Sequence, residues 1–144
     1  MKTILCIDDD AWILETLRDA LAARGYRVLV TTSTNAGPGC LKCEEVDLVL
    51  LDYNMPRKNG LAVYRELRAS ENVPVLFVSG CTRSVDLKSE SFRQEYEEEL
   101  RGARTDVLYK PFTLDALYEK VESFIGKGTP TLFRKGQPSE NQSN

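Results

Sequence analysis

The stretch LVLLDYNMPRKNG, residues 48–60, decides how the chain is organised. Four apolar residues run directly into an acid, Asp52, and a Met-Pro pair and an Asn-Gly turn follow. A short, continuously apolar run bounded by turn residues is typical of a strand buried on both faces of a parallel sheet. Asp52 is either a turn residue or a carboxylate that the strand delivers to a site, and the stretch alone does not distinguish the two.

The rest of the chain repeats this pattern, because short apolar runs alternate with segments of helical period. The expected strands are residues 3–7, 27–32, 47–51, 74–79 and 105–109, and the expected helices are residues 12–24, 36–45, 60–70, 84–101 and 113–125. This order predicts an α/β protein with a flavodoxin-like, doubly wound (βα)5 fold, whose parallel five-stranded sheet has the strand order 2-1-3-4-5. We expect one domain over residues 1–126 and a disordered tail over residues 127–144.

The composition excludes several kinds of chemistry. The 144 residues carry a net charge of −3 and include no histidine, which rules out Ser-His and Cys-His nucleophile pairs within the chain. The acidic balance and the lack of a clustered basic face argue against direct binding of nucleic acid. No apolar run approaches a membrane span and no secretory signal opens the chain, so we expect a cytoplasmic protein. Cys40 and Cys43 have C-x-x-C spacing, but without a second pair we interpret them as reduced thiols with no metal or redox role.

Polar residues gather where the predicted strands end. Asp8 and Asp9 follow the first strand, Asp52 follows the third, Ser79 ends the fourth and Lys110 follows the fifth. In an open parallel sheet these ends meet at one edge, where ligands bind. Crowded carboxylates without His or Cys favour Mg²⁺, and a lysine with a serine suits the oxygens of a phosphoryl group. The pattern predicts phosphorylation of a carboxylate at a magnesium site.

Asp10 has a simpler interpretation. It precedes the predicted helix of residues 12–24, where an acid complements the positive end of the helix dipole, and we assign it no role beyond that.

Four segments resemble, in order, the receiver domain of two-component response regulators. They are ILCIDDD, DLVLLDYNMPRKNG, VLFVSG and YKPF, and the resemblance extends over residues 1 to about 126. It implies a cis bond between Lys110 and Pro111, and a loop shaped by Met55, Pro56 and Gly60.

The same resemblance assigns roles to the residues at the strand ends. Asp52 matches the phosphoacceptor. Asp9 matches the direct metal ligand, Asp8 the acid that holds a metal-bound water, and the backbone carbonyl of Asn54 the third protein ligand to Mg²⁺. Lys110 matches the lysine that contacts the phosphoryl oxygens, and Ser79 the switch hydroxyl. Gly80, next to Ser79, matches the small residue that leaves the site open.

The implied function is that of a stand-alone phosphoacceptor, not an enzyme beyond self-phosphorylation and self-dephosphorylation. A sensor histidine kinase or a histidine phosphotransfer protein would be the phosphodonor. A downstream protein partner would read the face formed by the fourth helix, fifth strand and fifth helix. The resemblance allows either a monomer or a weak, phosphorylation-dependent dimer.

The chain departs from the family pattern in two places. The family has an aromatic switch residue three positions before the lysine, where this chain has Val107, and the nearest aromatic is Tyr109. Both side chains point to one side of a strand, so either Tyr109 replaces the missing aromatic in part or aromatic switching is absent. The segment between Ser79 and Lys110 is also longer and more acidic than usual, which changes the partner or blocks the usual dimer.

Three other functions remain as alternatives. A receiver-like interaction module would never be phosphorylated, which the full set of acids, hydroxyl and lysine argues against. A phosphatase with an aspartate nucleophile would need a second acid at position 54, where this chain has Asn54. A flavodoxin is disfavoured because the first loop is acidic, whereas a phosphate-binding loop is rich in small residues.

Overall fold

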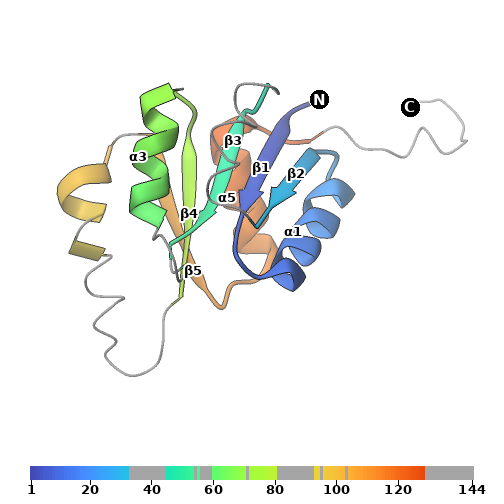
Figure 1. Ribbon diagram of the computed structural model, residues 1–144. Helices are drawn as coiled ribbons and strands as arrows, with labels where there is room; N and C mark the ends of the chain where they lie inside the picture. Colours follow the sequence, from blue (N-terminus) through green and yellow to red (C-terminus); the bar gives the residue numbers. More distant parts are fainter. Residues whose placement is uncertain are drawn as a thin grey trace, which may run out of the picture.

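The protein folds around a five-stranded parallel sheet, as the sequence pattern predicts. The computed structural model describes residues 1–32, 45–53, 55, 60–70, 72–80, 93–94, 96–102 and 104–128. The strands are β1 (Thr3–Ile7), β2 (Arg27–Thr31), β3 (Leu48–Asp52), β4 (Val75–Gly80) and β5 (Thr105–Lys110). Their order across the sheet is β2-β1-β3-β4-β5, and every neighbouring pair is parallel (Figure 1). The flavodoxin-like fold class is therefore confirmed.

Side chains of alternate residues in the central strands pack into two separate hydrophobic cores, one on each face of the sheet. Leu5 and Leu51 point into a cluster that α3 (Gly60–Ser70) covers. Cys6 and Leu50 point into a second cluster, which α1 (Ala11–Ala23) and α5 (Leu114–Ile125) cover on the other face. Because both faces are apolar, β1 and β3 are buried at every position. Polar side chains from these strands can reach solvent or a ligand at the ends of the sheet.

Side chains cap the first turns of two helices. The Asp10 side chain accepts hydrogen bonds from the backbone N–H groups of Trp12 and Ile13 and so caps α1. Thr113 caps α5 in the same way through the N–H of Ala116. Among the described residues, no helix is both long and apolar enough to cross a membrane.

The segment before β5 differs from the predicted helix. Within the predicted helix over residues 84–101, Arg93 and Gln94 are helical, and Tyr96–Leu100 form a π-helix, η1, in which the N–H of Arg101 donates to the carbonyl of Tyr96 at 2.9 Å. Leu100 is buried and Tyr96 packs against the core, while the residues between them face solvent. Residues 84–92, residues 36–44 of the predicted helix over 36–45, with its two cysteines, and the tail beyond residue 128 lie outside the described residues, and Glu45 is not helical.

The backbone of Gly60, at the start of α3, packs so closely against the end of β3 that no side chain fits at residue 60. Its N–H donates to the carbonyl of Tyr53 at 2.8 Å. A Cβ atom at this position would lie 2.7 Å from the Tyr53 Cα and 3.0 Å from the Asp52 carbonyl oxygen. The absence of a side chain at residue 60 therefore allows α3 to start directly beside Asp52.

We expect Gly60→Ala to lower the free energy of unfolding by about 1–3 kcal/mol, because the added methyl group must displace backbone atoms. Urea denaturation measures this change. Gly102→Ala is the matched control: its φ of 83° penalises alanine by about 1–2 kcal/mol, but no atom lies within 4 Å of the added Cβ. Only Gly60→Ala should also shift the backbone amide NMR signals of Asp52 and Tyr53, since it alone displaces the backbone there. Equal shifts of these signals in the two variants would contradict this expectation.

Candidate metal and phosphoryl site

Four strands deliver the candidate site residues to one edge of the sheet. Asp8 directly follows β1, Asp52 is the last residue of β3, Ser79 is the penultimate residue of β4, and Lys110 is the last residue of β5. The register pairs Asp52 with Val78 and Gly80 with Lys110, so these strand ends are level with one another. The sequence pattern placed these residues at a common edge, and the structure brings them together there.

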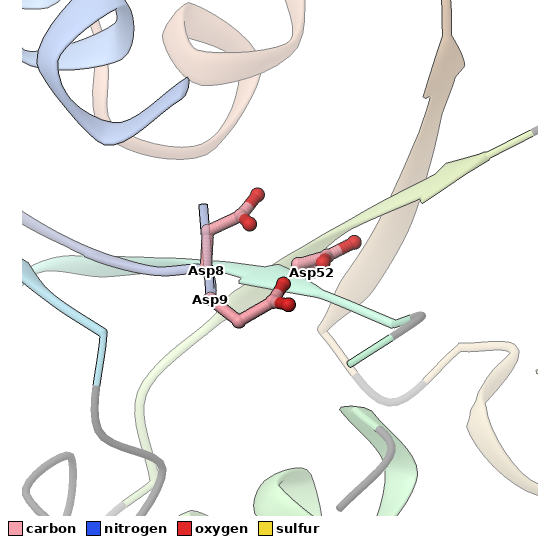
Figure 2. A group of neighbouring side chains, drawn as sticks. All are labelled: Asp8, Asp9 and Asp52. Carbon is pink, nitrogen blue, oxygen red and sulfur yellow. The ribbon is translucent and has the colours of Figure 1, made fainter. Parts of the chain in front are cut away.

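Three carboxylates form the centre of this site. One oxygen from each of Asp8, Asp9 and Asp52 lies within 4.8 Å of the other two, and Figure 2 shows the three side chains around a common space. Asp8 and Asp52 are buried, whereas Asp9 is exposed and leaves the cluster open to solvent. An all-oxygen donor set with one open side fits Mg²⁺, which keeps several of its waters when it binds to carboxylates.

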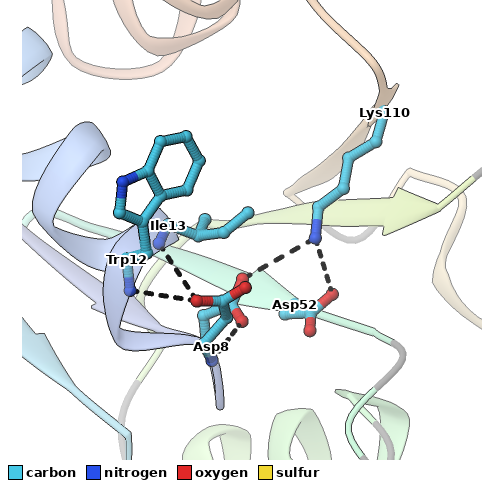
Figure 3. A network of polar contacts seen from close by, with 6 residues as sticks. Asp8, Trp12, Ile13, Asp52 and Lys110 are labelled. Atoms are coloured by element: carbon cyan, nitrogen blue, oxygen red, sulfur yellow. Dashed lines mark hydrogen bonds and ion pairs between the residues drawn. The ribbon is translucent and has the colours of Figure 1, made fainter.

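Lys110 supplies a positive charge on the other side of the cluster. Its Nζ atom lies 3.5 Å from Oδ1 of Asp52 and 3.7 Å from Oδ2 of Asp8 (Figure 3). The lysine side chain is 28% exposed, so its ammonium is accessible to a group that binds at Asp52. The bond from Lys110 to Pro111 is cis, as the resemblance implied.

Burial changes the acidity of Asp8. Desolvation raises the pKa of its carboxyl group from 3.8 to about 6, and the neighbouring charges of Asp52 and Asp9 add to this increase. The backbone N–H of Asp10, which donates to Oδ1 of Asp8 at 2.9 Å, and the Lys110 ammonium both act in the opposite direction. A cation bound at the cluster would favour the ionised form of Asp8.

Asp10 has a larger role than the sequence analysis gave it. Its side chain caps α1, and its backbone N–H fixes the orientation of the Asp8 carboxylate. One residue therefore ties the start of the helix to the site. The signal in the sequence was an acid two residues before another acid at a helix start, a spacing that permits this local side-chain to backbone bond.

Ser79 and the aromatic positions lie on the next two strands. Ser79 is fully buried and is paired in register with Tyr109. Val107 belongs to the core cluster under α3, and Tyr109 packs against that cluster, so both side chains lie on one face of β5 as predicted. Asn54 and Pro56 lie outside the described residues, whereas Met55 is buried.

Cys6 lies below this edge and takes no part in the site. The thiol is completely buried in the second core, and burial raises its pKa to about 12. It stays protonated and shielded, so it packs as a small apolar residue.

Comparison with known proteins agrees with this geometry. A family model described as the response regulator receiver domain matches residues 4–122. The chain is 29% identical over 123 residues to the cell cycle transcriptional regulator CtrA of Caulobacter vibrioides, a match that covers 85% of this chain and 49% of that protein. It is 32% identical over 130 residues to the transcriptional regulatory protein KdpE of Mycobacterium tuberculosis, covering 90% and 53%. The chain thus spans about half the length of these curated relatives.

Solved structures share the same fold. A response regulator receiver domain protein from Clostridium thermocellum aligns with a TM-score of 0.69 at 25% identity, covering 87% of this chain and 94% of that one. The chemotaxis protein CheY4 of Vibrio cholerae aligns with a TM-score of 0.71 at 23% identity, covering 86% and 98%. At 23% identity, the likeness to CheY4 concerns the fold alone.

The Asp8 carboxyl group should make the metal-free protein less stable as the pH rises. Since its pKa is higher in the folded than in the unfolded chain, the folded state binds more protons between about pH 4 and pH 6. The resulting loss of stability is absent below the pKa that Asp8 has in the unfolded chain. It is complete above the pKa that Asp8 has in the folded protein. We expect Asp8→Asn to raise the free energy of unfolding by about 2 kcal/mol at pH 7.5 and to leave it almost unchanged at pH 4.

Chemical denaturation in EDTA across this pH range measures the effect. Asp9→Asn is the matched control, because the Asp9 side chain is exposed and its removal relieves far less desolvation. If the free energy of unfolding of Asp8→Asn exceeded that of the wild type by the same amount at pH 4 and pH 7.5, the loss of stability could not be assigned to this carboxyl group.

Proposed function

The chain belongs to the response regulator receiver domain family, and from that premise we propose that it accepts a phosphoryl group on Asp52. One observation carries the proposal. The buried Asp52 carboxylate has an ammonium 3.5 Å from one of its oxygens and two further carboxylates beside it. A turn residue at the surface would have neither a cation partner at this distance nor a cluster of oxygen ligands.

The residues that would hold Mg²⁺ are Asp8, Asp9, Asp52 and the backbone carbonyl of Asn54. When bound, the ion neutralises charge on the carboxylates and on the phosphoryl oxygens. Asp8 would act through a metal-bound water and Asp9 as a direct ligand. The fit rests on the all-oxygen donor set and its open side at Asp9.

The transfer itself is an in-line displacement. An oxygen of Asp52 forms a bond to phosphorus while the bond from phosphorus to a histidine nitrogen of the donor breaks, and that nitrogen keeps the electron pair. Lys110 neutralises charge that develops on the phosphoryl oxygens, and its position near Asp52 requires little rearrangement. Ser79 donates its hydroxyl hydrogen to one of these oxygens once the group is in place. Attack by water on the phosphoaspartate resets the site.

The partners follow from the same chemistry. Because these 144 residues contain no histidine, the phosphohistidine must come from outside them, and we propose a sensor histidine kinase or a histidine phosphotransfer protein as its source. The readout is a protein partner that binds the surface around β5 and α5, or onward transfer of the phosphoryl group. We place this phosphorelay in the cytoplasm. Profiling phosphotransfer from each histidine kinase of the host would identify the cognate donor.

A receiver-like module that is never phosphorylated is the competing function. It would keep the fold without needing Lys110 beside Asp52, so the ion pair favours phosphorylation. A phosphatase is disfavoured because position 54 is an amide where a general acid would be required.

Phosphoramidate or acetyl phosphate with Mg²⁺ should add the mass of one phosphoryl group to the wild type and none to Asp52→Asn. Intact-mass spectrometry measures the product, and EDTA should abolish it. Asp106→Asn is a suitable control, since Asp106 is a half-buried carboxylate that pairs with Lys120 and lies away from the site.

Two outcomes would decide against this function. A wild type that stays unmodified with both reagents would favour the non-phosphorylated module. Steady, multiple-turnover hydrolysis of an ordinary phosphomonoester would instead favour the phosphatase.

A further inference from the structure

β5 directs one side of its backbone away from the rest of the sheet. Among the described residues, β5 pairs with β4 alone. The Arg104 carbonyl accepts a hydrogen bond from the N–H of Val75 at 3.2 Å, so the backbone groups of residue 104 point toward β4. Because successive residues of a strand direct these groups to opposite sides, the N–H and C=O groups of Thr105 and Val107 point away from β4. We call these groups the outer edge of β5.

A strand edge of this kind can add another strand. A row of backbone N–H and C=O groups is a template for pairing with another chain, and natural proteins protect it with charged side chains or neighbouring segments. β5 includes Thr105, Val107 and Tyr109, residue types that favour the strand conformation. The outer edge of β5 would therefore pair with another strand if its hydrogen-bonding groups were accessible.

Two side chains occupy hydrogen-bonding groups of the outer edge. Oδ1 of Asp106 accepts a hydrogen bond from the N–H of Val107 at 2.8 Å. The hydroxyl of Tyr96 donates to the carbonyl of Thr105 at 3.1 Å. One donor and one acceptor of the edge are thus bonded to side chains of the same chain.

Both of these side chains are themselves held in position. Nζ of Lys120, on α5, lies 2.8 Å from Oδ2 of Asp106, so the two carboxylate oxygens have separate partners. Because both side chains of this ion pair are more than a third exposed, the pair adds little stability and serves to orient the carboxylate. Tyr96 belongs to η1, whose Leu100 carbonyl accepts from the hydroxyl of Thr105 at 2.8 Å.

A second copy of this chain is the partner that fits the outer edge. Antiparallel pairing about a two-fold axis at Val107 places this residue opposite Val107 of the second copy, and each N–H donates to the carbonyl of the other. The Thr105 carbonyl is the next acceptor along the same edge. Self-pairing therefore requires the two backbone groups that Asp106 and Tyr96 occupy.

We propose that the outer edge of β5 is a latent self-association surface, which the side chains of Asp106 and Tyr96 keep closed. Loss of either hydrogen bond frees a backbone group, and two chains then pair edge to edge in a sheet that continues through both copies. This inference does not rest on the proposed function, because Asp106 and Tyr96 are not residues of the candidate site.

Asp106→Ala tests the proposal, because it removes the acceptor for the Val107 N–H. Amide hydrogen exchange followed by NMR at low protein concentration should be roughly tenfold faster at Val107 than in the wild type, the effect of losing a hydrogen bond to a charged group. At high protein concentration, sedimentation velocity should show more dimer for Asp106→Ala than for the wild type. The amide signals of Thr105 and Val107 should shift as that concentration rises.

Two variants separate the edge from the ion pair and from the net charge. Asp106→Asn keeps an oxygen acceptor for the Val107 N–H but loses the ion pair with Lys120, so its self-association should equal that of the wild type. Asp19→Ala removes an exposed carboxylate from α1, which packs on β1 and β2, and should also behave like the wild type.

Tyr96→Phe tests the same edge without a change at Asp106, should Asp106→Ala fail to fold. It removes the hydroxyl bond to the Thr105 carbonyl, so it should also form more dimer than the wild type. Equal self-association of the wild type and both variants overturns the proposal. Dimers whose concentration-dependent signals exclude Thr105 and Val107 overturn it too, as does equal dimer formation by Asp19→Ala and Asp106→Ala. None of these results bears on phosphorylation of Asp52.

Discussion

Mutual repulsion among Asp8, Asp9 and Asp52, held at one edge of a buried sheet, is the constraint on which the site depends. Two of these carboxylates are buried, and desolvation, together with the charges of Asp52 and Asp9, raises the pKa of Asp8 to about 6. The Lys110 ammonium lies close to both Asp8 and Asp52 and offsets part of this cost. Three acids and one lysine still leave the cluster negative when ionised. A divalent cation would neutralise this excess charge and so allow a phosphoryl group to approach Asp52.

The rest of the fold holds this unfavourable cluster in place. Alternation along β1 and β3 sends apolar side chains into two cores, which leaves the strand ends as the positions where acids are tolerated. Asp10 fixes Asp8 through a backbone hydrogen bond while it caps α1. Gly60 brings the start of α3 against the backbone of Asp52. Each device restricts one carboxylate, so the site is organised before any ligand arrives.

The sequence predicted most of this arrangement, because the information is local. Apolar runs gave the strands, and residues directly after those runs identified Asp52 and Lys110 at a common edge. The predicted helix over residues 113–125 likewise matches α5 to within one residue. The π-helix η1 was missed, since Tyr96 and Leu100 are spaced as in an ordinary helix and only their contacts with the core and Thr105 distinguish it. The close approach of Gly60 is likewise a tertiary contact that no local pattern reveals.

Replacement of the usual aromatic by Val107 makes the face of β5 the most distinctive part of the chain. A valine cannot swing between buried and exposed positions as a large aromatic ring does. Tyr109 and Tyr96 flank it on the same core cluster, one near the site and one on η1.

A crystal structure of the protein with Mg²⁺ and beryllofluoride tests the central claim most directly. The account predicts beryllium bonded to an oxygen of Asp52, with Lys110 and Ser79 in contact with its fluorine atoms and Mg²⁺ bound by Asp9 and Asp52. Beryllofluoride attached elsewhere, or Mg²⁺ bound without Asp52, would contradict it.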